Sequence, residues 1–200
     1  ELIHSAAAQE AFDLRSEPES IRQAYGPGTF AQGLLLGRRL LEAGVKLVTV
    51  YWHRDDPAVD TTWDTHADNF GGLKKRLIPR VDQSLAALLA DLHDRGMLDD
   101  TLVFWNSEFG RTPKINPRAG RDHWGKCNTV WFAGGGIRGG NIYGRSDAIA
   151  SAPEENAVSP ADLSATIYHL LGIPQSTTIY DSLDRPFPIS TGNILQDLLT

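Results

Sequence analysis

Two hydrophobic patterns alternate along the chain: apolar residues at helical spacing, and short apolar runs typical of strands. The helical spacing predicts one helix over 29–43, ended by Gly44, and a longer helical region over 69–95 that Pro79 kinks or splits. A third helix is predicted from Ser159, a capping residue followed by proline, to about Leu171. The apolar positions of the first helix are Leu34, Leu35, Leu36, Leu40 and Leu41.

Three runs rich in valine and aromatic residues predict strands over 45–52, 101–106 and 128–133. The run 101–106 is continuously apolar, which is typical of a strand buried on both faces. Helices and strands therefore alternate, and this order predicts an α/β fold with a largely parallel sheet and helices on both faces. Three strands are few for this architecture. We therefore expect residues 1–200 to form a single α/β domain that is part of a larger one.

Composition narrows the functional class. The formal charge of −6 and the absence of a basic run argue against a general nucleic-acid binder. No apolar stretch is long enough to cross a membrane. The single cysteine, Cys127, excludes an internal disulfide and any cysteine-rich zinc module.

Acidic residues and histidines gather just after or just before the predicted strands. Asp64 and His66 follow the first strand, Glu108 follows the second, and the pair Asp122 and His123 precedes the third. In open α/β sheets, ligands bind outside the carboxyl ends of the strands, where loops bring distant residues together. Carboxylates and imidazoles gathered in this way suit zinc or a similar divalent ion.

Each of these residues also has an ordinary structural interpretation. Asp64 is able to form an Asx-turn beside a surface histidine, Glu108 to cap a helix or pair with Arg111, and Asp122 to pair with Arg121. Arg111 and Lys126 fit an anionic substrate as well as they fit plain salt bridges. The three clusters together favour the metal interpretation.

Several motifs resemble a bacterial family known as domain of unknown function 1501, whose members are often labelled sulfatase-like. They are WDTHADNF, EFGRTP, GRDHW and GGGIRGGNIYGRSD, in this order along nearly the whole chain. The segments DDTLVFWNSEFG and SPADLSATIYHLLGIP are also similar to sulfatase sequences. The family itself resembles the alkaline-phosphatase superfamily, which implies an alkaline-phosphatase or sulfatase-like fold.

The resemblance implies a metal-dependent hydrolase of phosphate or sulfate esters. Asp64, His66 and His123 then correspond to the ligands of one ion, and Glu108 to a ligand of a second. Phe109 stands where the superfamily places a histidine and cannot bind a metal. Asp122 is the candidate for the missing ligand. The implied cofactor is zinc, with calcium or magnesium as alternatives. The implied substrate is a small anionic ester or a sulfated or phosphorylated glycan, with Arg111 and Lys126 as its contacts.

The superfamily nucleophile lies on an early strand that has no counterpart here, and family members are roughly twice as long. The resemblance therefore implies that this chain corresponds to the carboxyl-terminal half of the domain and is inactive alone. It also implies export to the periplasm. The alternative is a non-catalytic protein that kept the sulfatase-like fold and binds anions or glycans, which Phe109 at a ligand position favours.

Overall fold

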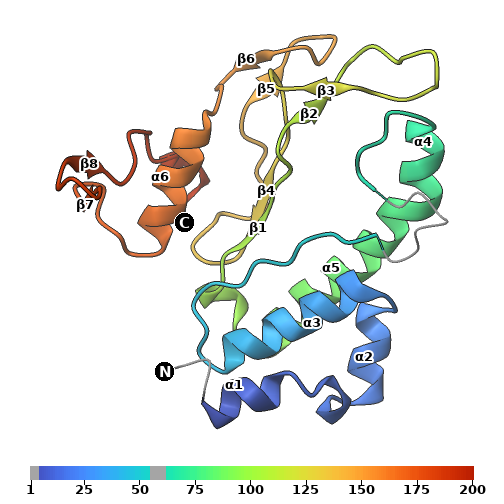
Figure 1. Ribbon diagram of the computed structural model, residues 1–200, viewed down its shortest axis with the longest axis vertical. Helices are drawn as coiled ribbons and strands as arrows, with labels where there is room; N and C mark the ends of the chain where they lie inside the picture. Colours follow the sequence, from blue (N-terminus) through green and yellow to red (C-terminus); the bar gives the residue numbers. More distant parts are fainter. Residues whose placement is uncertain (1–4, 55–61) are drawn as a thin grey trace. The chain divides into compact units, whose positions relative to one another are not determined.

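The computed structural model describes residues 5–54 and 62–200 (Figure 1). The chain divides into two compact units. The first comprises Glu1–Gly96 and Lys114–Asp122, and the second comprises Met97–Pro113 and His123–Thr200.

The first unit is helical. Its core is made by α3, which packs against α1, α2 and α5, and by α2, which also packs against α5. Among the fully buried apolar side chains are Tyr25, Leu35, Leu77 and Leu92. The elements are α1 (Ala6–Ala11), η2 (Leu14–Ser16), α2 (Glu19–Tyr25), α3 (Thr29–Glu42), α4 (Asn69–Gly72), the π-helical turn η3 (Leu73–Leu77) and α5 (Ile78–Asp94).

The end of α3 follows the predicted capping pattern. Gly44 adopts φ +90°, and its N–H donates to the carbonyl of Leu41 while the N–H of Val45 donates to that of Leu40. These two bonds are the Schellman motif, which satisfies carbonyls that the last helical turn leaves without partners. The prediction of a helix over 29–43 is thus confirmed to within one residue.

The predicted break at Pro79 is also confirmed. Proline has no N–H to donate to the residue four positions earlier, so the regular hydrogen-bond ladder cannot run through it. The chain accommodates this with the π-helical turn η3, in which the N–H of Ile78 donates to the carbonyl of Leu73, and α5 then begins with Pro79 in its first turn. The sequence also predicts that Gly96 ends this helical region, and Gly96, at φ +68°, lies just after the end of α5.

A charged network lies at the centre of this helical core. The guanidinium of Arg38, which is fully buried, is 2.8 Å from Glu17 Oε2, 2.8 Å from Asp91 Oδ2 and 2.5 Å from Glu42 Oε2. Tyr25 Oη donates to Asp91 Oδ2 over 2.9 Å. Burial opposes ionisation of Glu17, but hydrogen bonds from Arg38 and Arg39 keep the pKa of Glu17 below its ordinary value.

The segment 45–52 is extended but is not a strand, so that prediction is wrong. One face lies against α3: a Cβ at Gly33 would be 3.0 Å from Val50 Cγ1, and one at Gly37 would be 3.5 Å from Val48 Cγ1. The opposite face, with Leu47 78% exposed, is open to solvent. Among the described residues, no other segment pairs with it to form a sheet.

The second unit combines one helix with short strands. In sequence order it contains η4 (Leu98–Asp100), β1 (Val103–Trp105), β2 (Gly110–Arg111), β3 (His123–Trp124), β4 (Trp131–Ala133), β5 (Arg145–Ser146), β6 (Pro153–Glu155), α6 (Pro160–Leu170), β7 (Thr178–Tyr180), β8 (Pro186–Pro188) and η5 (Gln196–Leu198). The sequence predicts one more short helix near 192–199, and this segment contains the single turn η5.

The strands overturn the predicted alkaline-phosphatase or sulfatase-like fold with a largely parallel sheet. They pair antiparallel, two by two: β1 with β4, β2 with β3, β5 with β6 and β7 with β8. Consecutive parallel strands need a crossover connection, usually a helix. Residues 106–130, which connect β1 to β4, contain no helix and instead include the β2–β3 pair. The chain therefore returns antiparallel, with Phe104 stacked on Phe132 at 4.6 Å between ring centroids.

The helix α6 begins with a complete capping box. Ser159 Oγ accepts the N–H of Asp162, and the Asp162 carboxylate accepts the N–H of Ser159. The other carboxylate oxygen of Asp162 accepts the N–H of Asn193 over 2.7 Å, which ties the chain end to the helix. Hydrogen bonds from Ser159 and Asn193 lower the pKa of Asp162 to about 2.

This pKa predicts an acid-sensitive contribution to stability. Because folding lowers the pKa, the contribution is complete above the ordinary value of 3.8 and is lost as the pH falls through about 2. We expect Asp162→Asn to lower the free energy of unfolding by about 1 kcal/mol at pH 6, with the gap to wild type closing as the pH approaches 2. Urea unfolding at both pH values measures the gap. Asp197→Asn, at an exposed carboxylate, is the control; an Asp162→Asn gap independent of pH would contradict the prediction.

Among the described residues, no helix has both the length and the apolar character that crossing a bilayer requires.

Candidate metal centre

Two loops of the first unit, residues 63–69 and 116–122, position the Asp64, His66 and Asp122 side chains of the candidate site. Three backbone hydrogen bonds join them: Arg121 donates to Thr65, Asp68 to Arg118 and Asn69 to Ala119. The bond lengths are 3.0, 3.1 and 2.9 Å in that order. The buried Thr65 also donates from its hydroxyl to Asn69 Oδ1. The main chain around His66 is therefore held along the second loop.

Gly120 allows the two loops to approach this closely. A Cβ at this position would lie 2.0 Å from both the carbonyl carbon and the carbonyl oxygen of His66. Real Cβ atoms do not come within 3.0 Å of other heavy atoms, so only glycine fits here without moving the backbone.

The imidazole of His66 is held between two carboxylates. Its Nε2 lies 3.1 Å from Asp64 Oδ1, and its Nδ1 lies 2.7 Å from Asp122 Oδ1. The side chain of His66 is 33% exposed and that of Asp122 is 51% exposed, so the group is reachable from solvent. Hydrogen bonds from His66 and Asn116 keep the pKa of Asp122 below its ordinary value.

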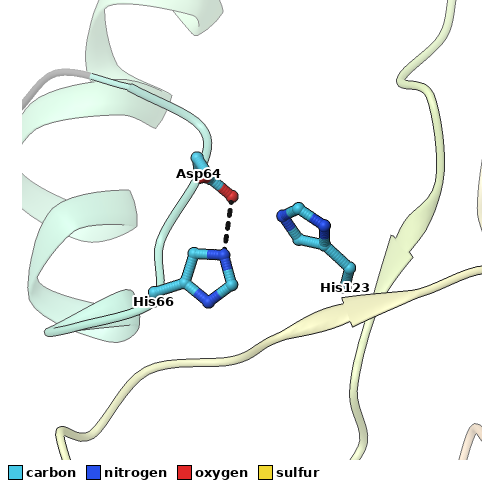
Figure 2. Close-up of side chains that lie close together, drawn as sticks. All are labelled: Asp64, His66 and His123. Carbon is cyan, nitrogen blue, oxygen red and sulfur yellow. Dashed lines mark ion pairs between the residues drawn. The ribbon is translucent and has the colours of Figure 1, made fainter.

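His123 follows Asp122 directly in the chain and begins β3. Asp64, His66 and His123 each offer one ligand atom, and these atoms lie within 4.8 Å of one another. Figure 2 shows the three side chains turned toward one another, with the contact between Asp64 and His66 as a dashed line. The ring of His123 packs on that of Phe109, 4.3 Å between centroids.

The donor set suits zinc. One carboxylate oxygen and two imidazole nitrogens are the kind of three-ligand group that catalytic zinc sites use, leaving a fourth position open. Ligand atoms about 2.0 Å from a tetrahedral ion are roughly 3.3 Å apart. The 3.1 Å between Asp64 Oδ1 and His66 Nε2 is close to this value, and all three ligand atoms lie within 4.8 Å of one another.

Comparison with known proteins places the chain in a family. The family model described as a protein of unknown function (DUF1501) matches residues 3–199. The chain belongs to this family. No curated protein and no solved structure matches it.

The remaining predicted site residues of this DUF1501 protein lie in the second unit. Glu108 is in an exposed bend after β1. Arg111, in β2, lies over the Phe109 ring at 5.9 Å and pairs in register with His123, while Lys126 lies over the Trp124 ring at 5.6 Å. Among the described residues, neither Glu108 nor Asp122 belongs to a group of three potential ligands. A second ion at Glu108 and the anion contacts at Arg111 and Lys126 stay predictions.

Sequence reasoning missed two residues of the site, Asn116 and Gly120. Asn116 donates from Nδ2 to the carbonyl of His66 and to Asp122 Oδ1, over 3.0 and 3.1 Å. Its Oδ1 accepts the N–H groups of Arg118 and Gly120. The sequence signal is the run Asn-Pro-Arg-Ala-Gly, since asparagine, proline and glycine together are typical of a turn built on an asparagine side chain.

Proposed function

We propose that this protein is a metal-dependent hydrolase of phosphate or sulfate esters. The observation that carries the proposal is the convergence of Asp64, His66 and His123, whose ligand atoms lie within 4.8 Å of one another. These residues occur in the motifs WDTHADNF and GRDHW, which resemble a family whose members are often labelled sulfatase-like, and this resemblance supports the reaction class. Zinc fits the donor set best, since calcium and magnesium prefer oxygen ligands throughout.

In this proposal, Asp64, His66 and His123 would hold the ion. A divalent ion bound by these residues would supply Lewis-acid chemistry: it would polarise the ester oxygen and stabilise negative charge developing there. Asp64 contributes the one anionic ligand, so the ion keeps a net positive charge toward an anionic substrate. Arg111 and Lys126 are proposed as contacts for the phosphate or sulfate group.

The first test is metal content. We expect protein purified without a histidine tag and incubated with zinc to hold about one zinc ion per chain. Plasma mass spectrometry measures this ratio. The double variant His66→Ala/His123→Ala should hold none, because a single carboxylate is left. His93→Ala is the matched control: this histidine is exposed on α5, and its removal should leave the zinc content unchanged.

Turnover is the second test. The full-length protein, loaded with zinc, should hydrolyse an aryl phosphate or an aryl sulfate, and the double variant should not. Unchanged zinc content in the double variant would falsify the metal assignment. Zinc binding without turnover of either ester would leave the site in place and overturn the catalytic proposal.

A second candidate function is non-catalytic binding of anions or sulfated glycans. The observation that favours it is the contact between Phe109 and His123, because the phenyl ring stands where the resemblance places a histidine ligand of a second ion. A single ion suits substrate binding as well as chemistry. Retention of the zinc-loaded protein on a sulfated polysaccharide, without release of sulfate, would identify this function.

A further inference from the structure

The geometry points to Asn116 and Asp122 as positioning residues that fix the His66 ring for metal binding. This inference rests on the proposed function, because it concerns how the same ion is held. It gives Asp122 a different part from the ligand role predicted from the sequence: Asp122 acts on the ion through His66.

The first step is that the two ring nitrogens of His66 have different partners. Nε2 faces Asp64, and Nδ1 lies 2.7 Å from Asp122 Oδ1. Histidines that bind metals through one nitrogen regularly donate the N–H of the other to a carboxylate, which fixes both the tautomer and the ring orientation. With Nδ1–H donated to Asp122, the lone pair of Nε2 points to the side where Asp64 lies.

The second step is the fixed orientation of the Asn116 amide. Its Nδ2 faces two acceptors, the His66 carbonyl and Asp122 Oδ1, and its Oδ1 faces two donors, the N–H groups of Arg118 and Gly120. Turning the amide over would place its NH₂ against two N–H groups and its oxygen against two oxygens. Both ends are therefore determined, and the side chain has a single favourable orientation.

The third step is that one amide group holds the histidine at two points. It donates to the main-chain carbonyl of His66, and it also donates to the Asp122 carboxylate that holds Nδ1 of the same ring. Rotation about the side-chain bonds of His66 is thereby restricted before any ion arrives. A ligand that is already ordered loses less conformational entropy on binding, so the affinity for the ion is higher.

The test compares zinc affinity, measured by competition with a chromophoric chelator, among four proteins. Asp122→Asn weakens the acceptor at Nδ1, and Asn116→Asp replaces the donor by an oxygen that repels the Asp122 carboxylate. Each should weaken zinc binding 10- to 100-fold relative to wild type, the usual cost of losing such a partner. Asn128→Asp is the matched control, since this amide donates to Ser107 in a loop of the second unit and should leave affinity within a factor of three.

Cobalt substitution supplies a readout that a merely structural role would not change. The visible absorption of bound Co²⁺ reports ligand geometry, so it should shift in Asp122→Asn and stay unchanged in Asn128→Asp. Unchanged affinity and spectrum in both Asp122→Asn and Asn116→Asp would overturn this inference and leave the metal centre standing. A wild-type protein that binds no zinc would overturn the proposed function, and this inference with it.

Discussion

Zinc affinity should fall about 100-fold when Gly120 is replaced by alanine, although residue 120 contacts no ion. The added Cβ would lie 2.0 Å from the His66 carbonyl group, so the loops 63–69 and 116–122 must separate by about 1 Å to relieve the clash. That movement stretches the hydrogen bonds from Arg121 to Thr65 and from Asn116 to His66. Displacing a catalytic group by about 1 Å can lower the reaction rate about 100-fold, and we expect a displaced metal ligand to weaken zinc binding by a similar factor.

Gly125→Ala is the matched control for this substitution. A Cβ at Gly125 would meet no atom within 4 Å, and its backbone conformation is one that alanine adopts without strain. Zinc titration of both variants, at equal helical content by circular dichroism, separates a local clash from general unfolding. Equal affinity in Gly120→Ala and wild type would show that the two loops do not need this spacing to hold the ion.

Helix ends were predictable because their signals are local. Gly44, Gly96 and Gly172 each follow a helix with positive φ, and Ser159 with Asp162 forms the capping box that its sequence indicates. Each of these signals depends on residues within about four positions, which a sequence displays directly. The ends of α3, α5 and α6 therefore agree with the sequence analysis to within one or two residues.

Strand pairing was not predictable in the same way. The runs 101–106 and 128–133 do contain β1 and β4, but their direction depends on the connection between them. The β propensity of 45–52 does not tell whether another segment lies beside it. A parallel sheet was expected from the alternation of elements and from the resemblance to the alkaline-phosphatase superfamily, and alternation carries no information about which backbones meet.

The candidate site likewise contains residues that the sequence reveals and residues that it does not. Asp64, His66 and His123 carry ligand chemistry, so their residue types alone point to a metal ion. Asn116 and Gly120 act through contacts with His66, fifty or more positions away in the chain, and neither residue type suggests metal chemistry. Likewise, the helical pattern of α3 placed leucines in the core but gave no sign that Arg38 is buried there.

Replacing Arg38 by leucine should lower the free energy of unfolding of the first unit by about 3–5 kcal/mol. The guanidinium forms ion pairs with Glu17, Glu42 and Asp91, and two of these carboxylates, Glu17 and Asp91, are buried. Without Arg38, they lose their central cation, although Arg39 and Arg95 still contact them. Leaving buried carboxylates short of positive charge costs far more than the leucine regains by burying apolar surface.

Hydrogen exchange at the amides of α3 and α5, read by mass spectrometry, localises the loss to the first unit. Arg22→Leu, at an exposed position on α2, is the matched control and should change stability by no more than about 0.5 kcal/mol. The stability loss of Arg38→Lys should lie between those of Arg38→Leu and Arg22→Leu. The lysine ammonium keeps the positive charge, but it lacks the planar guanidinium that contacts three carboxylates. If Arg38→Leu cost less than about 1 kcal/mol, the network would contribute no more than an exposed ion pair does, and Arg38 would not be needed to stabilise the helical core.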